Sequence, residues 1–235
     1  DAGRAVADQV VRAGLDLEAW RGPLVDAAGK PALRPGGAGE LDLSKGVPLL
    51  EVPDRKISRS EGDIHLFGNP HYWLDPRNAK IMAKTISDKL SEVDPTNAAD
   101  YEINMQAFIA KLDRKIGEWQ TKTKQFEGTE LVGYHNEWPY LMRFLGLKMV
   151  NFLEPKPGIP PTPKQTEFLQ QYIPEKHIKA IVQASYFPTK TAETIGQRTG
   201  AKVLLLCQGV GEIPQAADYV AMIDYNVNQI VAALQ

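Results

Sequence analysis

The chain has 235 residues and a net charge of -2, so it is long enough to bury the core of one large domain or two smaller ones. The near-neutral charge lacks the basic surplus of nucleic-acid-binding proteins, and we exclude nucleic acid as a partner. Its apolar runs fall far short of the roughly 18 residues that cross a bilayer, so we expect a chain that does not span a membrane. It contains a single cysteine, Cys207, at the end of an apolar run, which excludes an internal disulfide and predicts a buried thiol.

The first part of the chain predicts small and irregular elements. Residues 5–17 fit a strand or a helix, because the spacing of their apolar side chains does not decide between the two. Residues 15–20 lead into a short helix, and residues 34–40 form a loop rich in Gly and Pro. Residues 47–52 predict a strand.

The sequence Asn-Pro-His-Tyr-Trp-Leu-Asp-Pro occupies positions 69–76. Asp75 is a good helix N-cap and Pro76 suits the first helical position, so we expect a helix to begin directly after this motif. The helix has an apolar stripe, formed by Ile81, Met82, Thr85, Ile86 and Leu90. His71 would then lie on a rigid element just before the helix.

A second helical pattern runs from about residue 95 to residue 126. Apolar side chains recur along one face at intervals of three and four, at Tyr101, Met105, Phe108, Leu112, Ile116 and Trp119. Some 30 helical residues reach about 45 Å. The pattern fits an ordinary core helix, and it also fits a backbone helix that joins two lobes and resists bending.

From residue 128 onward, short β-branched segments alternate with helical ones. We expect strands at 130–134, 148–153, 178–184 and 202–207, and helices at 137–145, 163–172, 190–199 and 216–234. This alternation predicts a parallel sheet with helices on both faces, where ligands bind beyond the carboxyl ends of the strands. His135 follows the first such end, in Tyr-His-Asn-Glu-Trp at 134–138, and Asn136 is a candidate N-cap for the next helix.

Two of the four histidines, His71 and His135, therefore occupy similar positions before helices. Imidazole is a common neutral metal ligand and suits Zn²⁺, which normally takes four ligands. A lone surface histidine is more often simple polar surface, but two in matching settings favour a metal site. His65 is a third candidate, since Gly68 and Pro70 favour a turn that could bring it to His71; the alternative is a plain loop position.

Further candidates lie at the same end of the expected sheet. Glu154 opens a proline-rich segment, 154–163, and could be a ligand or a partner of one. Gln208 and Glu212 follow the last strand, in a glycine-containing loop that lacks the spacing of a nucleotide-binding loop. We exclude His177 as an exposed side chain. Gly-x-Ser-x-Gly and His-Glu-x-x-His are both absent, which argues against a serine nucleophile and against that class of metalloprotease.

Taken together, the two histidine motifs, the long helix between them and Glu-Pro-Lys-Pro-Gly-Ile-Pro-Pro-Thr-Pro at 154–163 resemble the zinc/manganese solute-binding proteins of ABC transporters, the TroA-like or cluster A-I family. The resemblance covers nearly all of residues 10–235. It implies an α/β fold with two lobes, each a mostly parallel sheet flanked by helices, joined by one long rigid helix. The lobes would be 1–94 and 128–235, with the linking helix at 95–127 and a metal in the cleft.

The same resemblance implies a role for each motif. His71 matches the ligand of the family's Pro-His-x-Trp-Leu segment, and His135 matches a second-lobe ligand that is histidine or glutamate in the family. The family's first histidine ligand lies upstream of the segment that residues 7–15 resemble, so we expect an incomplete N-terminal lobe. The fourth family position is an aspartate after the last strand, where this chain has Gln208 and Glu212 instead.

The resulting hypothesis is an extracytoplasmic binding protein, not an enzyme. It would be a monomeric periplasmic or cell-surface lipoprotein that delivers Zn²⁺, with Mn²⁺ as the alternative, to the membrane permease of an ABC importer. Two alternatives stay open. One is a zinc-dependent hydrolase on an α/β scaffold with Glu137 or Glu154 as base, and the other is a family member or fragment with an impaired metal site.

Overall fold

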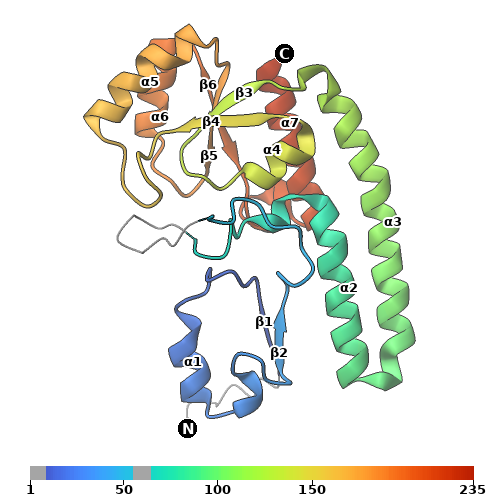
Figure 1. Cartoon of the computed structure of the whole chain (residues 1–235). Helices are drawn as coiled ribbons and strands as arrows, with labels where there is room; N and C mark the ends of the chain where they lie inside the picture. Colours follow the sequence, from blue (N-terminus) through green and yellow to red (C-terminus); the bar gives the residue numbers. More distant parts are fainter. Residues whose placement is uncertain (1–8, 55–64) are drawn as a thin grey trace.

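The computed structural model describes residues 9–54 and 65–235 (Figure 1). The N-terminal part contains a two-stranded parallel sheet of β1 (Val10–Arg12) and β2 (Glu40–Asp42). Helix α1 (Arg21–Ala28) and a one-turn 3-10 helix (Pro31–Leu33) connect the two strands. The ambiguous segment 5–17 thus contains a short strand, whereas 47–52 has no regular secondary structure, so the strand predicted there is wrong.

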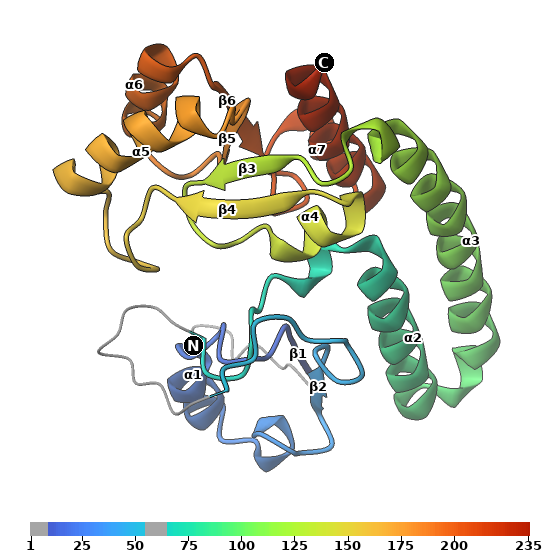
Figure 2. The same ribbon diagram turned by 45° about the horizontal axis from the view of Figure 1, so that its top comes forward.

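Two long helices lie side by side along one flank of the molecule (Figures 1 and 2). Helix α2 (Pro76–Val93) begins as predicted, because the Asp75 side chain accepts a hydrogen bond from the Arg77 amide and Pro76 occupies the first position. A 3-10 turn (Pro95–Asn97) leads into α3 (Ala98–Thr123), which ends in another 3-10 turn (Lys124–Phe126). Helix α3 runs from the level of the small sheet to the large one, so the long helix is confirmed.

The C-terminal part is a four-stranded parallel sheet in the order β4-β3-β5-β6. Its strands are β3 (Glu130–Gly133), β4 (Lys148–Phe152), β5 (Ala180–Ala184) and β6 (Lys202–Leu206). Its helices are α4 (Pro139–Leu145), α5 (Pro163–Glu175), α6 (Lys190–Thr199) and α7 (Tyr219–Leu234). A 3-10 turn (Pro214–Ala216) precedes α7. The predicted α/β class and parallel sheet are confirmed.

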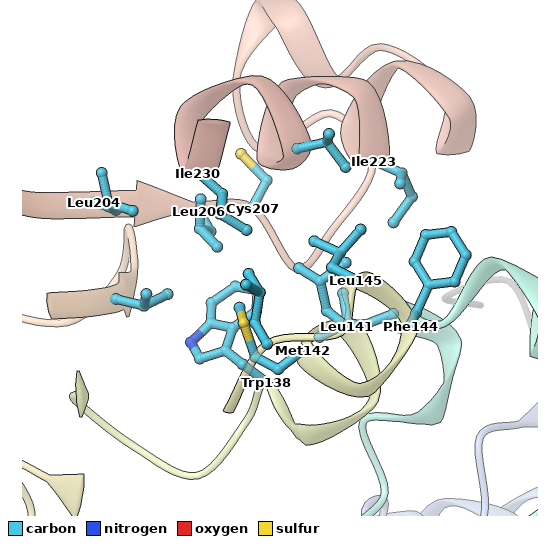
Figure 3. Close-up of a cluster of buried hydrophobic side chains, with 14 of the residues drawn as sticks. Trp138, Leu141, Met142, Phe144, Leu145, Leu204, Leu206, Cys207, Ile223 and Ile230 are labelled. Carbon is cyan, nitrogen blue, oxygen red and sulfur yellow. The ribbon is translucent and has the colours of Figure 1, made fainter. Parts of the chain in front are cut away.

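Each face of this sheet is covered by a separate apolar cluster. Helices α4 and α7 pack on one face together with α3, and Figure 3 shows Trp138, directly before α4, and Met142, within it, in one cluster with Cys207 and α7 residues such as Ile223. Helices α5 and α6 cover the other face through residues such as Leu169 and Ile195. The Cys207 thiol is buried, as predicted. None of the helices in the described ranges is long and apolar enough to cross a membrane.

The helix after His135 begins later than predicted. Trp138 is the N-cap residue of α4 and Pro139 its first position, so Asn136 does not cap the helix. The Asn136 side chain instead donates a hydrogen bond to Glu51. The segment 134–138 is therefore a loop that connects β3 to α4, and His135 lies within it.

Candidate functional site

His71 is buried and is held by a network centred on Asn69. The Asn69 Oδ1 atom lies 3.1 Å from the His71 amide nitrogen and 2.9 Å from His71 Nδ1. Because a backbone N–H can only donate, the shared atom is the amide oxygen, and His71 Nδ1 must carry a proton. The lone pair of the neutral ring is then on Nε2, which is the form that a metal ligand requires.

The network that holds His71 extends to the C-terminal sheet. Tyr140, on α4, donates a hydrogen bond from its hydroxyl to the Asn69 carbonyl at 2.9 Å and accepts one from the Leu50 amide at 2.9 Å. The Asn69 side-chain amide donates to the Asn136 carbonyl at 2.9 Å. Tyr140 is fully buried, so the segment before α2 is anchored on α4 by bonds shielded from water.

His135 is oriented in the same way by Glu154. Its Nδ1 lies 2.6 Å from Glu154 Oε2, which also accepts a hydrogen bond from the Gly158 amide at 3.0 Å. A carboxylate can only accept here, so Nδ1 is protonated and Nε2 carries the lone pair. Glu154 is nearly buried, and it occupies the position of a partner that orients the imidazole.

His65 has a carboxylate partner as well, although from a distant part of the chain. Its Nδ1 lies 3.3 Å from Asp16 Oδ1, and Asp16 Oδ2 accepts a hydrogen bond from the Leu66 amide at 3.3 Å. Asp16 adopts a left-handed backbone conformation, with φ of 61°. All three candidate histidines thus have a side-chain oxygen acceptor at Nδ1.

The three imidazoles lie next to one another. The ring centroids of His65 and His71 are 6.0 Å apart, and those of His71 and His135 are 6.1 Å apart. A cavity of about 290 Å³ opens beside them, and its described lining residues are Glu51, His65, Asn69, His135, Asn136 and Pro157. Within residues 9–54 and 65–235, however, no three His, Cys, Asp or Glu side chains are spaced closely enough to share a metal ion as they stand.

The electrostatics of the site favour neutral imidazole. Burial, together with smaller contributions from repulsion by the protonated His135 and His65 rings, lowers the pKa of His71 to about 3. His71 is therefore neutral at pH 7. A neutral ring can bind a cation without first losing a proton.

Gln208 and Glu212 lie elsewhere, in the loop that follows β6. Glu212 Oε2 accepts hydrogen bonds from the Gln208 and Gly209 amides of the loop, and Oε1 accepts one from the hydroxyl of Ser185, which directly follows β5. The Gln208 carbonyl accepts a hydrogen bond from Trp73 Nε1 at 2.9 Å. Neither residue lines the cavity beside the histidines.

Glu137 is also separate from that cavity. It is fully buried, and its carboxylate accepts hydrogen bonds from the Ala184 amide at 3.0 Å and the Tyr186 hydroxyl at 3.1 Å. Burial raises the Glu137 pKa to about 7. Its position links the loop after β3 to the end of β5, which is a structural role.

Sequence reasoning missed the acceptors Asn69 and Asp16 and the carboxylate of Glu51. Asn69 stood inside the recognised motif, and its position two residues before a histidine, as in an Asx turn, could have identified it. Asp16 and Glu51 carry no such local signal. Asp16 contacts His65 across 49 positions of sequence. Glu51 contacts Asn136, the neighbour of His135, across 85 positions.

Comparison with known proteins gives a consistent result. The high-affinity zinc uptake system protein ZnuA of Brucella abortus is 28% identical over 136 residues, which is 58% of this chain and 41% of that protein. The metal ABC transporter substrate-binding lipoprotein SloC of Streptococcus mutans is 27% identical and covers 97% of this chain and 74% of its own length. A crystal structure of ZnuA superimposes with a TM-score of 0.79 at 27% identity, over 99% of this chain and 82% of that one.

The matched part is only about two fifths of the Brucella protein's length. The family model, by contrast, matches almost the whole of this chain, from residue 4 to residue 233. The superposition on ZnuA spans both the small N-terminal sheet and the large C-terminal one. The chain therefore belongs to the family described as zinc-uptake complex component A, periplasmic.

Proposed function

We propose that this chain binds a Zn²⁺ ion through His65, His71 and His135 and presents it to the membrane permease of an ABC importer. The observation that carries the proposal is the common geometry of the three imidazoles. Each has its Nδ1 held by an oxygen acceptor, and neighbouring rings lie about 6 Å apart beside one cavity. Three neutral imidazoles suit zinc better than manganese, which prefers oxygen ligands.

The rings need only a small movement to share one ion. Imidazoles on a tetrahedral zinc have centroids roughly 5 Å apart when each Zn–N bond is about 2.0–2.1 Å. The observed centroid distances of 6.0 and 6.1 Å exceed this by about an ångström. His65 belongs to a different segment from His135, so its approach would complete the set of three imidazoles.

The proposal assigns the metal to a site between the two α/β parts of the chain. His71 precedes α2, while His135 follows β3 of the C-terminal sheet. We propose that residues 1–94 and 128–235 act as the two lobes and 95–127 as the linking helix. Release would then need a small lobe or loop shift, because α3 packs along both α2 and α7 and limits hinge bending.

The relatives support a binding protein rather than an enzyme. ZnuA is named for zinc uptake and SloC for substrate binding in a metal ABC transporter. Glu154, one candidate base of a hydrolase, is bonded to His135 and Gly158, and Glu137 is buried against β5. We accordingly place the protein outside the cytoplasm, as SloC is named a lipoprotein.

Zinc titration of the purified chain tests this proposal. We expect one high-affinity Zn²⁺ per chain by calorimetry with a competing chelator, and a loss of affinity of at least about 10- to 100-fold in His71→Ala and in His135→Ala. His177→Ala is the matched control, since His177 is exposed. Unchanged affinity in both site variants would refute the proposal, and parallel Mn²⁺ titrations would decide between the two metals.

A further inference from the structure

Glu51 is the carboxylate that faces the histidine cavity. Its side chain is exposed, and it lines the cavity together with His65 and His135. Its Oε2 accepts hydrogen bonds from the side-chain amides of Asn69, at 3.0 Å, and Asn136, at 2.7 Å. Within the described residues that line this cavity, Glu51 is the one acidic side chain.

We propose that Glu51 is the fourth ligand of the metal site and donates a carboxylate oxygen to the ion held by the three histidines. The inference rests on the proposed function and extends it, because it names the residue that completes the coordination shell. Zinc normally takes four ligands, and three imidazoles leave one position open. A carboxylate there would also offset part of the charge that three neutral ligands leave on the ion.

The other carboxylates near the histidines are already engaged. Glu154 accepts hydrogen bonds from His135 Nδ1 and the Gly158 amide, and Asp16 accepts from His65 Nδ1 and the Leu66 amide. Moving either onto the metal would release the imidazole that it orients. Glu51 accepts no hydrogen bond from an imidazole, because its partners are the neutral side-chain amides of Asn69 and Asn136.

The backbone at Glu51 supports a functional placement. Its φ is 54°, in the left-handed region that non-glycine residues rarely adopt. Such strain persists where surrounding contacts impose it, and it occurs often at binding sites. Glu51 lines the same cavity as His65 and His135, and its carboxylate is held by hydrogen bonds from the Asn69 and Asn136 amides.

A purely structural role for Glu51 makes a different prediction. If Glu51 only clamps Asn69 and Asn136, an amide oxygen at the same place would serve equally well. Glu51→Gln keeps that acceptor oxygen while removing the charge, so it separates the two roles. Glu175→Gln is the matched control, because Glu175 is an exposed carboxylate on α5, away from the cavity.

Zinc affinity and a crystal structure of the zinc-loaded wild-type chain together test the inference. We expect Glu51→Gln to bind zinc about 10- to 100-fold more weakly than wild type, while Glu175→Gln is unchanged. In the zinc-loaded crystal, a Glu51 oxygen should lie about 2.0–2.2 Å from the metal. Wild-type affinity in Glu51→Gln, or a Glu51 that stays on Asn69 and Asn136 with zinc bound, would overturn it.

The two proposals can fail separately. If His71→Ala abolishes zinc binding while Glu51→Gln binds zinc like wild type, the proposed binding function is supported and the proposed role of Glu51 is wrong. If His71→Ala and His135→Ala both bind zinc normally, the site itself is wrong, whatever Glu51 does.

Discussion

Asn69 and His71 form a closed pair in which one amide oxygen accepts both the backbone N–H and the ring Nδ1–H of the histidine. The pair fixes the tautomer, the rotation of the ring and the path of the chain at once. It is also coupled to the C-terminal sheet, since Tyr140 donates to the Asn69 carbonyl. The position of the imidazole therefore depends on both α/β parts of the molecule.

Asn69→Ala should weaken zinc binding by about 10- to 100-fold, as is usual when the partner of a metal-ligating histidine is removed. It leaves the buried His71 Nδ1 without its acceptor, so the metal-free protein should also lose about 1–3 kcal/mol of unfolding free energy. Calorimetry and urea denaturation measure the two effects. Asn228→Ala is the control, because Asn228 is exposed and bonded only to Lys122 in the described contacts. Equal affinities for the two variants would contradict the role of Asn69.

Glu154→Ala should reduce zinc affinity more than Glu154→Gln does. Glutamine can still accept the His135 Nδ1 proton through its oxygen, whereas alanine leaves the ring without an orienting partner. Competition with a chromophoric chelator would rank the affinities of the two variants. Glu167→Gln, at an exposed position on α5, should bind zinc like wild type. The prediction fails if alanine at position 154 leaves affinity intact.

Glu137 should make the unfolding free energy of the metal-free protein fall as pH rises. Burial raises its folded-state pKa to about 7 from an ordinary value of 4.5. Between these values the unfolded chain releases the proton while the folded protein keeps it, so stability declines through that window and levels off above pH 7. The loss would be on the order of 3 kcal/mol.

Urea denaturation at several pH values checks this expectation. Glu137→Gln removes the titrating group, so its unfolding free energy should fall less between pH 4.5 and 7 than that of wild type. Glu175→Gln, on the surface of α5, should follow the wild-type curve. Parallel curves for wild type and Glu137→Gln would show that the carboxyl does not titrate as proposed.

Trp73→Phe should loosen the loop after β6. The substitution removes the hydrogen bond from Trp73 Nε1 to the Gln208 carbonyl, at a cost of about 1 kcal/mol, and keeps most of the apolar contact. Hydrogen exchange of residues 208–213 should become faster. Trp20→Phe is the matched control, since Trp20 is 64% exposed. Exchange in 208–213 that is the same in both variants would refute this connection.

Tyr219→Phe offers a second test of the same contact region. The Tyr219 hydroxyl donates a hydrogen bond to the Trp73 carbonyl at 2.6 Å, from the first turn of α7. Its removal should destabilise the folded protein by about 1 kcal/mol without changing the number of zinc ions bound. Thermal unfolding and calorimetry measure these two quantities. A change in zinc stoichiometry would mean that Tyr219 acts on the metal site.

The spacing of apolar residues and the helix-capping residues in the sequence determined much of the architecture. The alternation of strand and helix after residue 128 predicted the parallel sheet, and Asp75 with Pro76 predicted the start of α2. Local chemistry suffices for these elements because a cap or an apolar stripe acts within one or two turns of chain. Local chemistry was insufficient at Asn136, which was expected to cap a helix but donates a hydrogen bond to Glu51 instead. It was also insufficient at 47–52, where tertiary contacts override the strand propensity of the sequence.

The sequence by itself also identified His71 and His135 as the candidate ligands, because each stands in a recognisable motif beside a helix. Only the tertiary structure brought His65 within 6.0 Å of His71, assigned Glu154 to His135 Nδ1 and placed Glu51 at the cavity. The physical reason is the distance along the chain over which the interactions act. A cap or a period is encoded by neighbours in the chain, whereas the shell around an imidazole is assembled from distant segments and exists only once the two α/β parts have packed together.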